Sequence, residues 1–339
     1  MKVNLNLISK EDSIFLAGHK GMVGKSILKA LSKNDYKNIL LVDRKELDLT
    51  NENDVSNWFK KTKPKIVILA AAKVGGIEAN KNNPTEFLLE NIKIQNNVIE
   101  NAWKNDSKRL LFLGSSCIYP KLATQPIVEE SLLSSYLEPT NESYALAKIL
   151  GIRLCTSLRK QYGFDAISLM PTNLYGPGDN YHPKNSHVLP SLIRKFHYAK
   201  TNHIKTVTCW GDGSPFREFM HVDDLGNATL FALEKWNPDN NENSPKYKDG
   251  EKITFLNVGT GKDITIKSLS EKIAALVGFQ GEIVWDKTMP NGTPRKLLNS
   301  DRLRNLGWSP KVTLDEGLKD TIKSYSKLFS ENSLRGVNF

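Results

Sequence analysis

The chain has 339 residues, of which 39% are hydrophobic and 25% charged, a composition typical of a globular protein with one large or two smaller domains. No run approaches the roughly 18 apolar residues of a membrane span, and the first residues lack the apolar stretch of a signal peptide. The net charge of +10 includes no Lys/Arg run longer than two, which argues against nucleic acid as the partner.

Three cysteines without a spacing pattern argue against a disulfide framework and predict a reducing, cytoplasmic location. No Cys/His cluster has the spacing of a metal site, so we expect no metal.

Apolar runs alternate with helix-like segments through the first half of the chain. The runs lack alternation of polar and apolar residues, as expected of parallel strands covered on both faces. We predict strands at 13–18, 38–43, 65–72, 109–116 and 166–173, with helices between them at 24–34, 52–63, 86–104 and 144–163 and a further strand at 253–259. The repeated strand–helix–strand order predicts an α/β fold with a Rossmann-type doubly wound parallel sheet.

The stretch AGHKGMVGKSI follows the first strand and opens the first helix, with glycines at Gly18, Gly21 and Gly24. Glycines allow a tight turn and a close approach of the backbone to a pyrophosphate, which rests on the helix N-terminus. The context predicts a dinucleotide site.

The second strand ends at LVDRKELDL, which offers both Asp43 and Arg44. An acidic residue there would bind a ribose hydroxyl of NAD, whereas Arg44 together with Lys20 could clamp the 2′-phosphate of NADP. The two cations favour NADP(H); the alternative is that all three residues are ordinary surface charges.

SYALAK places Tyr144 and Lys148 one helical turn apart. A lysine cation favours the phenolate, and the tyrosine can act as a general acid toward a carbonyl as hydride arrives. A serine of LGSSCIYPK, Ser115, could hydrogen-bond the carbonyl oxygen. Cys117 of the same stretch, considered by itself, would be interpreted as a small core residue.

These residues, with LYGPGDN and REFMHVDDL, resemble the extended short-chain dehydrogenase/reductase family from about residue 13 to 325. A closer resemblance, to the GDP-L-fucose synthase family, is carried by AGHKGMVG, AAAKVGG, LGSSCIYPK, LEPTNESYALAK, MPTNLYGPGDNYHPKNSHVLPSL and GTPRKLLNSDRL. It implies an NADP-binding domain over 1–177, with returning segments near 219–262, and a smaller α/β substrate domain, mainly 178–339.

The resemblance implies an enzyme that epimerises GDP-4-keto-6-deoxy-D-mannose at C3 and C5 and then reduces C4 with NADPH, giving GDP-L-fucose. The family's epimerisation pair falls on Cys117 and His187. Ser115 and Tyr144 would hold the C4 oxygen, and Lys148 would bond the nicotinamide ribose. We assign Cys155 and Cys209 to packing.

The cofactor residues implied by the motifs and the family are Gly18, His19, Lys20, Gly21, Met22, Val23, Gly24, Arg44, Asp48, Leu49, Leu113, Gly114, Ser115, Ser116, Tyr144, Lys148, Pro171, Thr172, Asn173, Leu174 and His187. The substrate residues implied by the family are Gly75, Gly76, Asn173, Lys195, Trp210, Arg217, Asn291 and Lys296. The family often has arginine at Lys195 and aspartate at Asn291, so a GDP-4-keto-6-deoxy-heptose is a rival substrate.

Three other readings remain. One is a C4-reductase alone, against which both Cys117 and His187 argue. Another is a sugar-nucleotide 4-epimerase or 4,6-dehydratase, although a dehydratase would want an acidic pair where SSCIY stands. The last is a non-catalytic NAD(P) sensor. The resemblance also implies a homodimer paired through helices 86–104 and 143–162.

Overall fold

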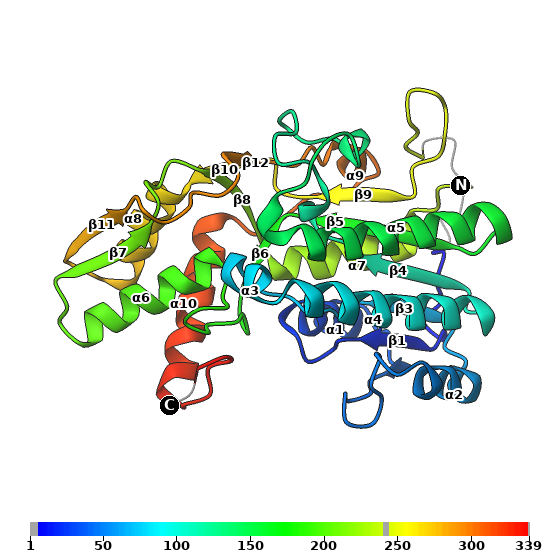
Figure 1. The fold of residues 1–339 in the computed structure, drawn as a ribbon. Helices are drawn as coiled ribbons and strands as arrows, with labels where there is room; N and C mark the ends of the chain where they lie inside the picture. The colour runs from blue at the N-terminus through cyan, green and yellow to red at the C-terminus, as the bar shows by residue number, and fades with distance from the viewer. Residues whose placement is uncertain (1–5, 240–243, 338–339) are drawn as a thin grey trace.

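The computed structural model describes residues 6–239 and 244–337. Within them, six parallel strands form the central sheet in the order β2-β1-β3-β4-β5-β9 (Figure 1). Their bounds are β1 Ile14–Ala17, β2 Ile39–Leu40, β3 Ile66–Leu69, β4 Arg109–Leu113, β5 Ala166–Pro171 and β9 Phe255–Val258. The order reverses between β1 and β3, and ligands of doubly wound sheets bind beyond the carboxyl ends of the strands at such a point.

Helices cover both faces of this sheet. On one face lie α1 (Met22–Lys33) and α7 (Val222–Lys235), and on the other α2 (Glu52–Thr62), α4 (Pro84–Lys104) and α5 (Glu142–Tyr162). The first strand shows why the predicted runs are apolar throughout. Ile14 and Leu16 pack in one core, while Phe15 and Ala17 pack in the other. The predicted fold class is confirmed.

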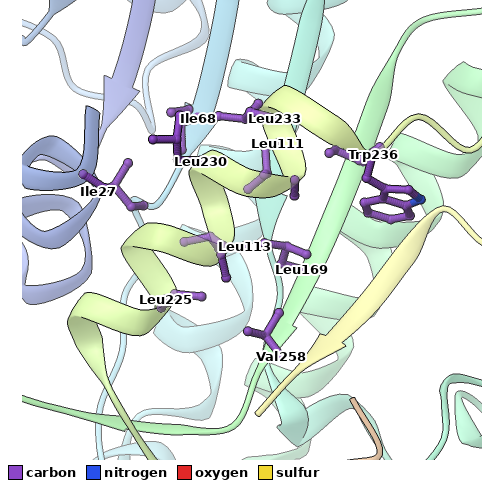
Figure 2. Close-up of a cluster of buried hydrophobic side chains, with 14 of the residues drawn as sticks. Ile27, Ile68, Leu111, Leu113, Leu169, Leu225, Leu230, Leu233, Trp236 and Val258 are labelled. Atoms are coloured by element: carbon purple, nitrogen blue, oxygen red, sulfur yellow. The ribbon is translucent and has the colours of Figure 1, made fainter. Parts of the chain in front are cut away.

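Figure 2 shows the core between α7 and the sheet, where the leucines of α7 and Trp236 lie against side chains of the strands and of α1. Trp236 has no exposed surface, and Leu225 and Leu233 are equally buried. Through this packing α7, and β9 after it, lie at the central sheet although the chain has already entered the second part of the molecule.

The second part is a smaller α/β unit with a core of its own. It contains α6 (Val188–Thr201), β7 (Thr206–Trp210), α8 (Ile266–Val277), β11 (Glu282–Asp286) and α10 (Leu314–Ser330). The strands β6 (Asn173–Tyr175), β8 (Phe216–His221), β10 (Asp263–Thr265) and β12 (Arg295–Lys296) form a ladder between the two parts.

All the predicted strands are shorter in the structure, and two of them differ in a further way. The run at 38–43 forms only the two-residue β2, because the chain turns away toward the cavity at Val42. The run at 166–173 ends its pairing with the central sheet at Pro171, and Asn173 starts β6 beside β8. The switch from one sheet to the other follows from the tertiary arrangement rather than from the apolar run.

Short helices complete the chain: α3 (Ile77–Asn82), α9 (Asp301–Asn305) and the 3₁₀ turns η1 (Ser116–Ile118), η2 (Glu129–Ser131) and η3 (Pro139–Asn141). No helix in the described residues is long and apolar enough to span a bilayer. The described His, Cys, Asp and Glu side chains also form no group of three suited to a metal ion.

Candidate active site

A cavity of about 1190 Å³ lies at the carboxyl ends of the central strands and extends into the second part of the molecule. Every residue predicted for catalysis, cofactor binding or substrate binding lines this one cavity. These residues are far apart in the sequence, from Gly18 to Lys296, and the fold brings them together.

The glycine loop forms the cavity wall at the start of α1. A Cβ atom on Gly24 would lie 2.1 Å from the Gly18 carbonyl oxygen, so the first turn can close on the loop only without a side chain there. Gly21 is the N-cap of α1 and no acidic residue stands in the first turn, which leaves the helix N–H groups open to an anion. This cradle fits the pyrophosphate of a dinucleotide.

The loop after β2 carries two residues of opposite charge, Asp43 and Arg44. Lys20 Nζ lies 2.6 Å from the Asp43 carboxylate and His19 Nε2 lies 3.3 Å from it. The hydrogen bond from Lys20 holds the pKa of Asp43 below its usual value. Arg44 is exposed in the cavity wall and makes no ion pair within the described residues. Lys20 thus neutralises Asp43, and Arg44 is the cation left for a phosphate.

The predicted reduction residues come from the N-cap of η1, Ser115, and from the first turns of α5. Lys148 is buried, and its Nζ donates to the Leu113 carbonyl oxygen at 2.8 Å. Burial lowers the pKa of Lys148 to about 7. An ammonium has three donors, and the other two have no partner among the residues described. Those donors suit the hydroxyl groups of a cofactor ribose.

The surroundings of Tyr144 influence its ionisation. Lys148 Nζ lies 5.8 Å from the Tyr144 ring centroid and does not hydrogen-bond the phenol. Burial raises the pKa of Tyr144, the nearby Cys117 raises it further, and a hydrogen bond with Ser115 opposes the shift. The phenolate expected from a lysine and a nicotinamide cation stays a prediction, since in the protein alone desolvation is the largest influence on the pKa of Tyr144. The phenol keeps its proton and can donate it.

Cys117 lies in η1 on the cavity wall rather than in the core. The Ser115 hydroxyl caps the turn by accepting the Cys117 backbone N–H at 3.3 Å. The thiol is flanked by two donors, Asn141 Nδ2 at 3.4 Å from Sγ and Lys296 Nζ at 3.9 Å.

His187 faces the same space from the start of α6, for which it is the N-cap residue. Its side chain is exposed to the cavity while protein surrounds it, and this reduced hydration lowers its pKa, with a contribution from the positive charge of Lys296. Lys296 is therefore close to both Cys117 and His187. The arrangement places two groups capable of proton transfer around one ligand volume.

The far end of the cavity is cationic and carries an exposed tryptophan. Lys195 Nζ donates to the Thr208 carbonyl oxygen at 2.9 Å, and Arg217 Nη1 donates to the Phe216 oxygen at 2.8 Å. Burial lowers the pKa of both side chains, which favours an anionic ligand beside them. Trp210 is 43% exposed and offers a ring face for stacking.

Four residues predicted to contact the substrate also make hydrogen bonds or close packing contacts within the protein. Asn291 Oδ1 accepts the Asp212 N–H at 3.0 Å, and Asn173 Nδ2 donates to the Glu218 carbonyl oxygen at 2.8 Å. The Gly76 N–H donates to the Asn185 oxygen at 3.0 Å. A Cβ on Gly76 would lie 2.4 Å from the Ser186 oxygen, and one on Gly75 would lie 2.8 Å from the Ala79 Cβ. The two glycines thus dock the segment that carries His187.

Sequence reasoning missed Asn141, Lys73 and Asp179, which also line the cavity. Asn141 lies three residues before Tyr144 within a quoted motif, so position alone could have suggested it. Nothing local marks the other two. Cys155 and Cys209 are buried as predicted, and burial raises the pKa of Cys155 to about 12.

Comparison with known proteins identifies the family of the chain. Residues 14–245 match the model of the NAD dependent epimerase/dehydratase family. GDP-L-fucose synthase 1 of Arabidopsis thaliana is 51% identical over 95% of both chains. GDP-L-fucose synthase of Escherichia coli is 47% identical over 95% of this chain and 98% of its own.

A solved structure gives the same result for the fold. The GDP-mannoheptose C4 reductase from Campylobacter jejuni with NADP bound has a TM-score of 0.81 and 36% identity, covering 94% of this chain and 99% of its own. On these matches and the cavity geometry, the chain belongs to the NAD dependent epimerase/dehydratase family and, within it, to the GDP-L-fucose synthase family.

Proposed function

We propose that this protein converts GDP-4-keto-6-deoxy-D-mannose to GDP-L-fucose by epimerisation at C3 and C5 followed by NADPH-dependent reduction at C4. The observation that carries the proposal is the shared cavity. Ser115 and Tyr144, which suit the reduction, line the same cavity as Cys117 and His187, which suit the epimerisation. The 51% identity to a synthase over nearly the whole chain supports the choice of reaction.

The epimerisation needs a base, an acid and support for an enolate. Cys117 as a thiolate takes the proton from the carbon beside the carbonyl, and the electrons of the broken C–H bond move onto the carbonyl oxygen. The Ser115 hydroxyl and the Tyr144 phenol donate to that oxygen. His187 returns a proton to the carbon from the other side, after which the carbonyl re-forms.

The reduction uses the same oxygen contacts. NADP(H), the cofactor of this family, supplies the hydride when bound, and the glycine loop, Arg44 and Lys148 would hold it. Tyr144 transfers its phenolic proton to the C4 oxygen as that oxygen gains charge, while Ser115 stays hydrogen-bonded to it. The raised pKa of Tyr144 keeps the acid protonated before the reaction.

The nucleoside diphosphate of the substrate fits the far end of the cavity. Arg217 and Lys195 meet the diphosphate oxygens, and Trp210 stacks on the base. In this arrangement the sugar would lie between that end and Cys117, since all of these residues line one cavity.

A related heptose is the second candidate substrate. The neighbour from Campylobacter jejuni is named as a GDP-mannoheptose C4 reductase. Lys195 and Asn291 are the two positions where this chain departs from the family pattern, and both line the substrate end. Measuring kcat/KM for both keto sugars separates the two candidates, and a ratio that favours the heptose overturns the hexose assignment.

A homodimer completes the proposal. Leu89 of α4 and Leu146 and Leu150 of α5 are exposed, large and apolar, on two helices that pack against each other. Exposed leucines on adjacent helices suit an interface between two copies. We also propose a cytoplasmic location, since all three cysteines are free thiols.

The direct test is an assay with GDP-4-keto-6-deoxy-D-mannose and NADPH, followed by NMR of the ring stereochemistry of the product. We expect NADPH oxidation and a product with the L-galacto configuration. A 6-deoxy product with unchanged C3 and C5 would reduce the function to C4 reduction alone. In Cys117→Ser, deuterium from solvent should no longer enter at C3 and C5 while NADPH still binds; undiminished exchange would make Cys117 structural.

A further inference from the structure

Asn141 is an N-cap residue that does not cap its helix. It precedes α5 with φ −131° and ψ 17°, and its side chain accepts no hydrogen bond from the first turn. Asparagine is favoured at this position because its side-chain oxygen normally accepts such a bond. Here the amide turns the other way, and Nδ2 lies 3.4 Å from Cys117 Sγ.

The other half of the Asn141 amide is unsatisfied. Its Oδ1 atom is buried and has no hydrogen-bond partner among the described residues. A buried carbonyl oxygen without a donor is unfavourable, so it needs a partner from outside the chain. Asn141 lines the cavity, and the sugar of the proposed substrate carries hydroxyl donors.

The surroundings of Cys117 are rich in cations and donors. Lys296 Nζ lies 3.9 Å from Sγ, and Arg217 and Tyr144 interact electrostatically with the thiol. Glu138 faces Arg217, and His187 faces Lys296. Of the two donors with a hydrogen-bond contact to Sγ, the Asn141 amide is the neutral one and the nearer one.

We propose that Asn141 is a positioning residue for the epimerisation: its Nδ2 holds the Cys117 thiolate in place, and its Oδ1 accepts a hydrogen bond from a sugar hydroxyl group. This inference rests on the proposed function, since it assigns Cys117 as the base. One side chain at the start of α5 thereby couples the base of the first half-reaction to the helix that carries Tyr144 and Lys148.

The thiol half of the proposal can be tested without any sugar. The rate of Cys117 alkylation by iodoacetamide is followed against pH in the full chain, with the modified residue identified by mass spectrometry. Cys117→Ser gives the background from the two buried cysteines. Asn141→Asp keeps a residue type that is favoured at this position and keeps the size of the side chain, but replaces the donor by a negative charge.

We expect the midpoint of the alkylation profile to rise by about one pH unit in Asn141→Asp and by less in Asn141→Ala, because both changes remove support for the thiolate. Asn83→Ala is the matched control. Asn83 is also an N-cap residue with φ −133° and no side-chain cap, but it starts α4 outside the cavity. A profile for Asn141→Asp that coincides with the unaltered protein would overturn the proposal.

The sugar half is tested with GDP-4-keto-6-deoxy-D-mannose. In Asn141→Ala, we expect solvent deuterium entry at C3 and C5 to fall roughly tenfold or more and KM for the sugar to rise, while NADPH affinity stays unchanged. Unchanged exchange and KM would overturn the sugar contact. If the unaltered protein oxidises no NADPH with this sugar, the proposed function fails, whereas the alkylation profiles still decide the thiol contact.

Discussion

At the scale of single residues, burial is the largest influence on the pKa of Tyr144. A phenol enclosed by protein loses the hydration that would stabilise its anion. Lys148 does not hydrogen-bond the phenol, since its Nζ donates to the Leu113 carbonyl oxygen. The raised pKa of Tyr144 makes it an acid that is protonated throughout the neutral range.

Tyr144→Phe removes this acid and keeps the ring. We expect NADPH oxidation with the 4-keto sugar to fall by about a hundredfold or more, because proton donation contributes on the order of 10²–10⁴ to such rates. NADPH binding, followed by fluorescence, should be retained because the glycine loop is untouched. Turnover close to that of the unaltered protein would remove Tyr144 from the reaction.

Arg44 is the residue that we expect to make the protein bind NADPH in preference to NADH. It is exposed at the cavity and has no ion pair within the described residues, so its charge is available to a 2′-phosphate. In Arg44→Ala we expect KM for NADPH to rise roughly tenfold or more and KM for NADH to change little. Lys45→Ala, an exposed neighbour outside the cavity wall, is the control. Equal losses for both cofactors would contradict the assignment.

Burial of Asp179 is expected to make the stability of the folded state depend on pH. It is buried, its Oδ2 atom has no partner among the described atoms, and burial raises the pKa of Asp179 to about 7. The folded state therefore holds a proton that the unfolded state releases near pH 4. It follows that stability falls as pH rises from about 4 to 7.

Asp179→Asn should remove this loss. The gain in free energy of unfolding of the variant over the unaltered protein should be about 1 to 3 kcal/mol larger at pH 8 than at pH 5. Thermal or urea unfolding of both proteins at both pH values measures this difference. Asp249→Asn is the control, since Asp249 is exposed and its carboxylate also accepts a backbone N–H. The same difference in both variants, or none in Asp179→Asn, would contradict the burial argument.

At the scale of elements, the site is assembled from the ends of β4, α5, α6 and β12. The turn η1 follows β4 directly and presents Ser115 and Cys117 beside the first turns of α5. The loop after β3 then docks the start of α6 through Gly76 and Asn185. The half-sites of the two reactions therefore depend on how these ends pack on one another.

Gly76→Ala tests that packing. Gly76 has φ −70° and ψ −175°, which alanine adopts without strain, so the effect must come from the Cβ meeting the Ser186 oxygen at 2.4 Å. We expect the His187 segment to shift, stability to fall by about 1 to 3 kcal/mol, and deuterium entry to fall more than NADPH affinity. Unchanged exchange would show that His187 does not depend on this loop.

At the scale of the whole molecule, the proposed dimer predicts a mass of twice 38.1 kDa in light scattering. Leu150→Asp places a charge on the exposed face of α5, and we expect it to shift the protein toward the monomer. Leu122→Asp changes a leucine that is 80% exposed, against 41% for Leu150, and that lies outside α4 and α5; it serves as the control. An unaltered protein that is monomeric would contradict the interface.

Much of the fold follows from the sequence because its signals are local. The buried strands of a parallel sheet are apolar on both faces, as Ile14–Ala17 shows, and the spacing of glycines marks the turn into α1. The parallel, doubly wound type of sheet also follows from the repeated strand–helix–strand pattern. The bounds of β2 and the switch from β5 to β6 could not be predicted, since both depend on neighbours distant in the sequence.

For the site, the sequence by itself determined the residue types: a glycine loop, a Tyr–Lys pair one turn apart, and a cysteine two residues after Ser115. Only the tertiary structure decided what each does in its surroundings. In the fold, Lys296 and the Asn141 amide both lie beside the Cys117 thiol. Gly76 packs against the segment that carries His187, and burial raises the pKa of Tyr144. The reason is physical: hydrogen-bond direction and desolvation depend on which distant segments surround a group, and no local pattern encodes that.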